Sequence, residues 1–466
     1  SKRRVANFFD RNRMASEQAN TLKELEKRML SDGGWPWFPG GKRSDFITLY
    51  IVTGFGRLRH LGVEIPVKMA LRSVHGLDRW IKRTYDHIMK YGHPEKNNYS
   101  NLIAYYLYGR SFFLKEKSIE STSRDAVDYF LGQAKKYWTG LNNRMSEGHT
   151  AIGLLRFGRK ETPSEILASL RERALHDEEM GMYWGDEEFA YWWYRAPIET
   201  QAMMIETFQE LSGTEKETED LKVWLLKQKQ TQDWKTNKAT ADAIYALLLR
   251  GADLLSGTKL VKVWVGSEEV RPEKVEAGTG FYEKRWSGPE IRAEQGRIRM
   301  VKEEKGIAWG GLHWQYFQDL SKIKAHGNNL DLEKQIFVRR NTKKGPVISP
   351  IQKESLEVGD TMVVRVVLRA DRDFEYVHMK DGRGSGTEPV NVLSHYKYQD
   401  GLAYYESTKD TATHFYFDYL PKGTYVFEYD VKIFHKGEYT AGMAEIECLY
   451  APEFRAHSQS FQLRVK

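Results

Sequence analysis

Two short acidic stretches are the first candidates for chemistry in this chain. Residues 176–179 are His-Asp-Glu-Glu, and residues 185–188 are Gly-Asp-Glu-Glu. Paired carboxylates can carry out acid–base catalysis or bind a divalent cation. Acidic residues at the ends of helices are mostly solvated, so we expect neither stretch to form a catalytic or metal site.

The histidine and serine residues also form no recognisable catalytic motif. The thirteen His residues are scattered, and the His-Glu-x-x-His spacing of helical zinc sites is absent. Ser385 lies in Gly-Arg-Gly-Ser-Gly (382–386), without the strand–turn–helix context of a nucleophile elbow, so we expect a loop between strands there. The sequence therefore predicts no catalytic residue, no cofactor-binding residue and no metal ligand.

Two aromatic clusters are the candidates for an interaction surface. They comprise Trp35, Trp37 and Phe38 in the first cluster, and Tyr191, Trp192, Trp193, Tyr194 and Arg195 in the second. An aromatic strip with an arginine could stack a sugar ring or hold a peptide. Loop aromatics also plug the ends of helical rings, and we favour such packing for both clusters.

Length and composition indicate a folded, multidomain chain. At 466 residues the chain is too long for one ordinary core, so we expect two or three domains. The net charge of +7 is spread over 71 basic and 64 acidic residues without long runs of one sign. This mixture indicates solvated faces and argues against a nucleic-acid groove or a polybasic membrane anchor.

The single cysteine and the start of the chain give two further expectations. Cys448 lies in an alternating segment, residues 444–450, so we expect a packed thiol in a strand and no intrachain disulfide. There is no apolar run of about 20 residues, the length needed to span a bilayer, and no signal peptide. Because the chain opens directly on a helix-like segment without Met, we expect it to be a piece of a longer protein.

The first half of the chain has a degenerate helical repeat. Three Trp-bearing turns, each followed by an apolar helix, lie in residues 32–55, 182–211 and 233–249. Further amphipathic stripes occupy residues 65–90, 99–114, 122–139 and 217–229. Another helix is expected after Thr162, which would cap it, with Pro163 in the first turn. Repeated helices joined by Trp/Gly loops predict a closed ring of helix pairs, an α/α toroid, over residues 1–252.

The hydrophobic pattern changes to that of strands near residue 251. Residues 260–265 and 291–302 alternate, and residues 306–317 are expected to form an aromatic strand with a Gly-Gly bulge. After about residue 330 the chain is β throughout, with clear alternation in 362–369 and 425–433. Strands at this spacing predict a C-terminal antiparallel β-sandwich. The expected fold class is thus multidomain α plus β.

Three parts of the sequence resemble bacterial α2-macroglobulin-like proteins. Residues 31–62 (SDGGWPWFPGGKRSDFITLYIVTGFGRLRHLG) resemble a segment of their thioester domain, and residues 224–248 (WLLKQKQTQDWKTNKATADAIYALL) resemble the last repeat of that helical domain. Residues 417–440 (FDYLPKGTYVFEYDVKIFHKGEYT) and 443–458 (MAEIECLYAPEFRAHS) resemble their C-terminal macroglobulin-like sandwich. These segments follow the family's order and extend over nearly the whole chain.

The resemblance implies a domain organisation and a non-enzymatic function. Residues 1–252 would be the thioester-type toroid without its N-terminal helices, 253–330 the returning part of a CUB-like domain, and 331–466 the macroglobulin-like sandwich. Family members present a bait segment, change shape when a protease cleaves it, and entangle that protease. Proteases would therefore be the partners of the full-length parent, in the periplasm or at the cell surface, with any membrane anchor outside this chain.

The reactive group of that family is not found in this sequence. A thioester needs a Cys-x-Glu-Gln step, and the one similar string, residues 15–18 (Ala-Ser-Glu-Gln), has no sulfur at the cysteine position. In the family this step precedes the GGWPWF segment by more residues than this chain contains. The resemblance therefore places any thioester, and the bait, upstream of Ser1.

Two alternatives remain open from the residues. An α/α-toroid polysaccharide lyase would also place β-domains after a helical ring, and a basic, aromatic-rich chain would suit an acidic glycan. Such an enzyme would need a deep cleft in which a Tyr, a His and an Arg converge. The other alternative is a non-catalytic module that binds glycans or proteins.

Overall fold

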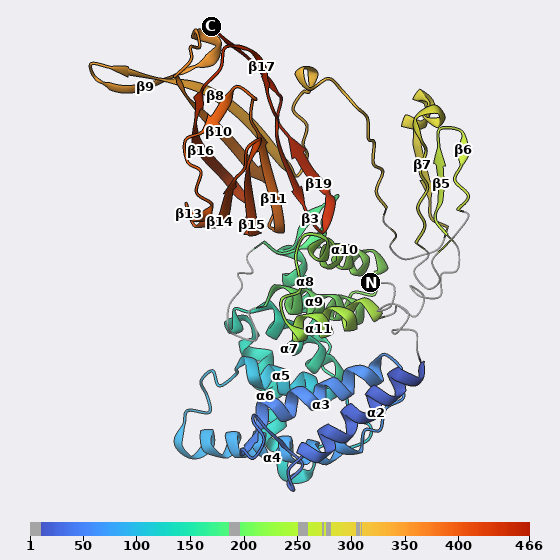
Figure 1. Cartoon of the computed structure of the whole chain (residues 1–466). Helices are drawn as coiled ribbons and strands as arrows, with labels where there is room; N and C mark the ends of the chain where they lie inside the picture. The colour runs from blue at the N-terminus through green and yellow to red at the C-terminus, as the bar shows by residue number, and fades with distance from the viewer. Residues whose placement is uncertain are drawn as a thin grey trace. The chain divides into compact units, whose positions relative to one another are not determined.

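The computed structural model describes residues 11–185, 196–249, 260–272, 275, 281–303, 308 and 310–466 (Figure 1). The chain divides into two compact units. The helical unit comprises residues 1–225 and 235–308, and the sandwich unit comprises residues 226–234 and 309–466. Among the described residues, no helix is both long and apolar enough to cross a membrane.

In the described part of the chain, ten α-helices lie wholly in the helical unit or, in the case of α10, begin in it. They are α2 (Arg11–Arg28), α3 (Asp45–His60), α4 (Lys68–Tyr91), α5 (Asn101–Ser111), α6 (Ser121–Tyr137), α7 (Arg144–Arg156), α8 (Glu161–Glu172), α9 (Pro197–Leu211), α10 (Glu215–Thr231) and α11 (Asn237–Leu248). Short strand pairs lie between them, namely β1 (Trp35–Pro36) with β2 (Arg43–Ser44), and β3 (Leu175–Asp177) with β4 (Gly181–Tyr183).

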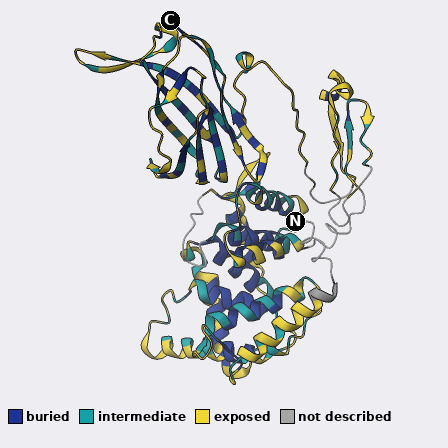
Figure 2. Cartoon of the chain, in the orientation of Figure 1, coloured by how far each residue is buried: buried dark blue, intermediate teal, exposed yellow. Residues whose placement is uncertain are grey.

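The helices form an inner and an outer set. Helices α3, α5, α7, α9 and α11 pack one against the next, and their middle members are buried on all sides (Figure 2). Helix α4, by contrast, buries only one face, as an outer amphipathic helix does. Asp78 of α4 joins the two sets, because it accepts hydrogen bonds from Tyr106 and Arg110 of α5 at 2.7 and 2.9 Å. This arrangement is that of the predicted helical ring.

Side-chain caps begin four of the five inner helices. Ser44, Ser100, Asn143 and Thr236 each accept a hydrogen bond from a backbone N–H in the first turn of α3, α5, α7 and α11, respectively. Helix α9 instead begins with Pro197, whose fixed φ suits a first helical position. The prediction that Thr162 caps α8 is wrong. That helix begins at Glu161, and Thr162 is a buried residue of its first turn.

The β-segment after the helices is smaller than predicted. Strands β5 (Lys262–Val265), β6 (Glu268–Glu269) and β7 (Ile298–Val301) form one antiparallel sheet in the order β6-β5-β7. The expected strand at 306–317 is wrong for residues 310–317, which are exposed and pair with no strand within the described part of the chain. The aromatic residues of this segment favour a strand, but a strand also needs a neighbouring strand with which to pair. Residues 304–307 and 309 lie outside the described residues.

The sandwich unit consists of two antiparallel sheets with a common core. One sheet has the order β12-β16-β10-β8-β9 and the other the order β13-β14-β15-β11-β18-β19, and β17 pairs separately with β20. The bounds are β8 (Leu330–Thr342), β9 (Gly345–Pro350), β10 (Thr361–Ala370), β11 (Phe374–Gly382), β12 (Thr387–Pro389), β13 (His395–Gln399), β14 (Leu402–Thr408), β15 (Ala412–Leu420), β16 (Gly423–Ile433), β17 (Gly437–Ala441), β18 (Ala444–Cys448), β19 (Ala451–His457) and β20 (Phe461–Val465). Cys448 is buried at the end of β18, as predicted.

One buried ion pair connects the two sheets of the sandwich. Lys334 of β8 and Asp381 of β11 are almost completely buried, with 2.5 Å between Nζ and Oδ1. The ammonium also donates to the carbonyl oxygens of Gly382 and Gly442 at 2.9 and 2.7 Å, and Tyr429 donates to the other oxygen of Asp381. All three ammonium hydrogens are thus used, which is what a buried charge requires. The predicted fold class, multidomain α plus β, is confirmed, whereas the division into residues 1–252, 253–330 and 331–466 stays a prediction.

Candidate functional site

A pocket with charged and apolar walls opens at one end of the inner helices. It measures about 330 Å3 with its open mouth, and its enclosed part has room for about one water-sized group. Its walls come from all five inner helices: Phe46, Tyr50 and Arg57 of α3, Tyr105 of α5, Met145 and His149 of α7, Glu199 and Met203 of α9, and Lys238 and Asp242 of α11. Below, we call it the axial pocket.

The axial pocket lies where the N-termini of the inner helices meet. Apart from Arg57, every residue in its walls belongs to the first two turns of its helix. The five helices therefore point the same way, and the positive ends of their dipoles converge on the pocket. Convergent helix N-termini favour negative charge.

Two cations and two acids share the base of the pocket. Arg57 Nη1 lies 2.6 Å from Asp242 Oδ1, and Lys238 Nζ lies 2.8 Å from Asp242 Oδ2. Lys238 is also 3.7 Å from Glu199. Burial alone would lower the pKa of Arg57, but the neighbouring Tyr108, Asp242 and Glu206 outweigh it and raise that pKa well above its ordinary value. Arg57 thus stays charged.

The other titratable groups are shifted toward their neutral forms. Burial, reinforced by the positive charges of Arg57 and Lys238, lowers the pKa of His149 well below its ordinary value. Burial and the nearby Asp242 raise the pKa of Glu199, although Lys238 opposes this shift. His149 Nδ1 is buried and has no hydrogen-bond partner among the described residues. A neutral imidazole with an unused nitrogen therefore forms part of the pocket wall.

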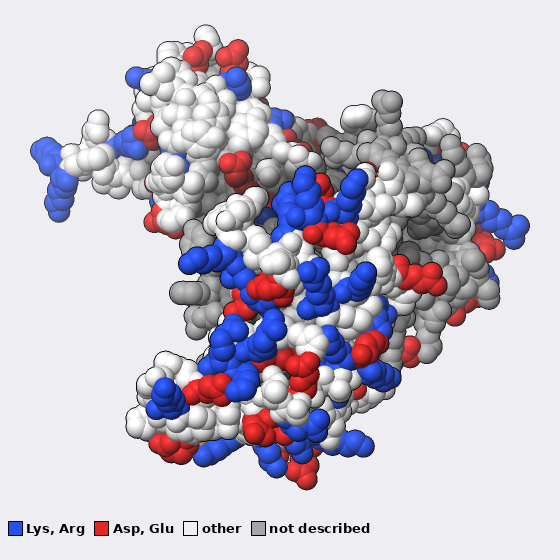
Figure 3. Space-filling view, turned by 90° about the horizontal axis from the view of Figure 1, so that it is seen from below, with Lys and Arg blue, Asp and Glu red and all other residues white. Residues whose placement is uncertain are grey.

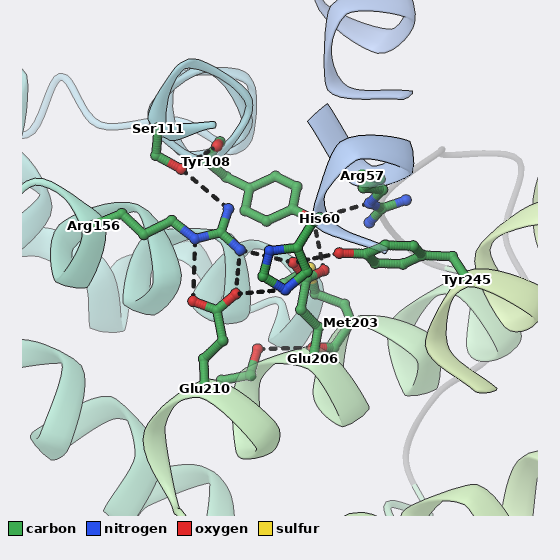
Figure 4. A network of polar contacts seen from close by, with 10 residues as sticks. Arg57, His60, Tyr108, Ser111, Arg156, Met203, Glu206, Glu210 and Tyr245 are labelled. Carbon is green, nitrogen blue, oxygen red and sulfur yellow. Dashed lines mark hydrogen bonds and ion pairs between the residues drawn. The ribbon is translucent and has the colours of Figure 1, made fainter. Parts of the chain in front are cut away.

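Below the pocket, a polar network fills the axis of the ring (Figure 4). Glu206 of α9 is completely buried and accepts hydrogen bonds from Tyr108 of α5 at 2.6 Å, Tyr245 of α11 at 2.9 Å and Arg156 of α7 at 3.1 Å. Arg57 of α3 donates to the same Tyr108 hydroxyl at 2.9 Å. One carboxylate and its partners therefore connect all five inner helices.

The first aromatic cluster lies beside the axial pocket. Trp35 is buried, and its indole N–H donates to Leu25 O of α2 at 2.8 Å, so the packing hypothesis holds for this residue. Trp37 and Phe38 are 58% and 69% exposed, which the packing hypothesis did not predict. Trp37 stacks on Phe46, a wall residue of the pocket, with the ring centroids 6.1 Å apart. One exposed ring, that of Trp37, therefore packs on the pocket wall, and the ring of Phe38 lies beside it with the centroids 6.4 Å apart.

The other candidates from the sequence either lie outside the described residues or are exposed elsewhere in the helical unit. Tyr191, Trp192, Trp193, Tyr194 and Arg195 lie outside the described residues, as do Asp186, Glu187 and Glu188. Residues 176–179 form an exposed strand end and turn, in which Asp177 accepts hydrogen bonds from the N–H groups of Glu179 and Met180. Residues 15–18 lie on an exposed part of α2.

Sequence reasoning missed most residues of the axial pocket. Tyr50, His149, Glu199 and Lys238 carry no motif, and their shared property is a position in the first turns of alternate helices. That spacing could have been found only after the inner helices had been distinguished from the outer ones.

On the face shown in Figure 3, basic and acidic side chains are interspersed, in accord with the mixed charge of the sequence.

Comparison with known proteins identifies the class of the sandwich as macroglobulin-like. Residues 330–453 match the family model of the bacterial alpha-2-macroglobulin MG10 domain. The resemblance to the bacterial α2-macroglobulin-like family is thereby confirmed for the C-terminal region of this chain. No protein with curated function matches the chain.

Three solved structures similar to the chain are those of bacterial alpha-2-macroglobulins. Escherichia coli alpha-2-macroglobulin activated by porcine elastase has 15% identity and a TM-score of 0.44, over 98% of this chain and 39% of that one. The trypsin-activated Escherichia coli protein has 14% identity and a TM-score of 0.44, over 98% and 30% of the two chains. A Salmonella alpha-2-macroglobulin mutant, Y1175G, has 15% identity and a TM-score of 0.34, over 95% and 27%. This chain thus spans less than half the length of these three proteins.

Proposed function

We propose that this chain is the C-terminal part of a bacterial α2-macroglobulin-like protease trap and that it is not itself an enzyme. The observation that carries the proposal is the match of residues 330–453 to the MG10 domain, a domain of such proteins. The helical ring before it supports the proposal, because a toroid followed by a macroglobulin-like sandwich is the order that the resemblance implies. The bait, and a thioester if the parent has one, would lie upstream of residue 1.

The trap mechanism assigns a mechanical function to this chain. Cleavage of the bait in the parent would release a strained arrangement of domains, as proteolysis releases other switches. In this chain, the network around Glu206 would keep the helical ring intact as a body during that movement. The partners would be proteases in the periplasm or at the cell surface, and any membrane anchor would belong to another part of the parent.

The proposal is tested by the size dependence of inhibition. The full-length parent should be incubated with an excess of a protease that cleaves its bait, and the captured protease then assayed on a small peptide and on a large protein. A trap excludes the large substrate, so activity on the protein should fall while activity on the peptide persists. This chain alone should inhibit neither assay. Equal loss in both assays, or inhibition by this chain alone, would contradict the proposal.

One observation favours a second candidate, a polysaccharide lyase. Tyr50, His149 and Arg57 do line the same pocket, which is the convergence such an enzyme would need. Arg57 is, however, bound to Asp242 and Tyr108, and the enclosed space is too small for a sugar ring. The test is to incubate the chain with uronic-acid polysaccharides and to follow the ultraviolet absorbance of the unsaturated product. An increase that is lost in His149→Phe would support the lyase.

A further inference from the structure

The axial pocket combines a polar base with an apolar rim. Phe46, Met145 and Met203 form apolar parts of its wall, the exposed ring of Trp37 stacks on Phe46, and the exposed ring of Phe38 lies against Trp37. A site built in this way suits a ligand that has one charged group and one apolar group next to each other. The charge of the base decides which sign the ligand carries.

The side-chain charges of the base balance, and the helix N-termini make its electrostatics favour an anion. Arg57 and Lys238 supply two positive charges, and the N-termini of five helices add their partial positive charges. Against them stand Asp242, which is paired with both cations, and Glu199. Lys238 is the more exposed cation of the base, with 28% of its side chain accessible against 14% for Arg57, so it can reach a group that enters from the mouth.

His149 offers a hydrogen bond that no described residue uses. It is 2% exposed, and its imidazole packs against the rings of Tyr105 and Tyr108. The centroid of the imidazole lies 4.9 Å from that of Tyr105 and 4.8 Å from that of Tyr108. Its Nδ1 has no partner among the described residues. An unsatisfied buried polar atom costs stability unless a ligand or water completes it, so this atom indicates an occupant.

We propose that the axial pocket binds a carboxylate, namely the free C-terminus of a peptide whose last side chain is apolar. One carboxylate oxygen fits the enclosed space beside Lys238 and His149, and the apolar side chain lies on Trp37 and Phe38. Proteolysis creates new C-termini of this kind, so the biological source of the ligand rests on the proposed function. The binding itself does not depend on it.

The rim favours a peptide over an acidic sugar. A sugar-binding platform presents aromatic rings that are coplanar, whereas the rings of Trp37 and Phe38 meet at 64°. Two of the wall residues, Met145 and Met203, are thioethers, which accept hydrogen bonds from the hydroxyl groups of a sugar only weakly. An apolar side chain, in contrast, gains from contact with both the rings and the methionines.

The test compares two peptides that differ only at their last group. The whole chain, at neutral pH, is titrated in a calorimeter with an acetylated pentapeptide ending in phenylalanine, either as the free acid or as the C-terminal amide. We expect the acid to bind roughly tenfold or more tightly than the amide, the effect of one charge-assisted hydrogen bond. Lys238→Met and Trp37→Ala should each weaken binding of the free-acid peptide by about tenfold.

Matched controls separate the site from the surface in general. Lys68→Met removes an exposed lysine from the start of the outer helix α4, and Tyr91→Ala removes an exposed ring elsewhere, so both should leave binding unchanged. Melting curves establish that each variant is folded. Equal binding of acid and amide, no binding at millimolar peptide, or equal loss in the control variants would overturn the proposal. Binding of an oligouronate in place of the peptide would also overturn it. None of these outcomes would bear on the trap assay of the parent, which measures exclusion of a large substrate from the captured protease.

Discussion

Arg57 of α3 and Asp242 of α11 lie 2.6 Å apart, and their contact joins the first and the last of the five inner helices. The guanidinium also lies over the ring of Tyr245, 4.8 Å from its centroid. A chain of helices that pack only in sequence order would have two free ends. Here those two helices are joined by a charge pair that is mostly shielded from water.

Breaking this closure should destabilise the helical part. Asp242→Asn leaves Arg57 charged and poorly paired, so we expect the free energy of unfolding to fall by about 2–4 kcal/mol. The measurement is urea unfolding followed by the helical circular dichroism signal. The control is Asp86→Asn, which breaks an exposed pair with Lys82 and should cost less than about 0.5 kcal/mol. Similar costs for both variants would refute the idea of a closing pair.

Glu206 should be the most sensitive position of the axis. Replacing it by Ala leaves the hydroxyls of Tyr108 and Tyr245 without their acceptor and removes a partner of Arg156, so we expect a loss of about 3–5 kcal/mol. Glu210→Ala removes only the contacts with Arg156 and His60, near the edge of the network, and should cost clearly less. Equal losses would show that the network does not centre on Glu206. Urea unfolding of the two variants under the same conditions decides between these outcomes.

The buried His149 should make stability depend on pH. Because its pKa is lowered in the folded chain, the unfolded chain binds the proton more tightly, and stability must fall as the pH falls below about 6.5. The slope from this residue is at most about 1.4 kcal/mol per pH unit. In His149→Phe the difference in unfolding free energy between neutral and mildly acidic solution should therefore shrink. His87→Phe, at an exposed position, should leave it unchanged, and an unchanged slope in His149→Phe would argue against the shift.

In the sandwich, the pair of Lys334 and Asp381 should show strong coupling. Lys334→Met leaves the buried Asp381 without its cation, with an expected cost of about 3–5 kcal/mol. The double variant Lys334→Met with Asp381→Leu removes both charges and should recover much of this loss. A double-mutant cycle measured by denaturant unfolding gives the coupling energy directly. Additive effects of the two substitutions would mean that the pair is not a unit.

The helices and strands were largely predictable because their signals are local. The apolar stripe of residues 196–211 and the alternation of 425–433 correspond to α9 and β16 within a few residues. Local signals also explain the failures. Thr162 has the residue type of a cap, yet α8 begins one residue before it. The aromatic residues of 310–317 have β propensity but no strand beside them.

The axial pocket was not predictable, for two physical reasons. Its contacts are non-local: Arg57 and Asp242, for example, are 185 positions apart. Helix α7 is, in addition, buried on all sides over Arg144–Leu154, so no stripe in its sequence distinguishes the side on which His149 lies. Trp37 and Phe38 were noticed as aromatic residues, but their exposure follows from how the loop before α3 is fixed by the buried Trp35.

The way in which Glu206 ties four inner helices, with Arg57 adding the fifth, limits how such a protein can evolve. Open arrays of helical repeats lengthen or shorten by whole units, since each unit contacts only its neighbours. When the inner helices share one central carboxylate, the gain or loss of a helix pair would leave the donors to that carboxylate without their acceptor. We therefore expect homologues to keep the number of helix pairs constant and to vary in the loops between them.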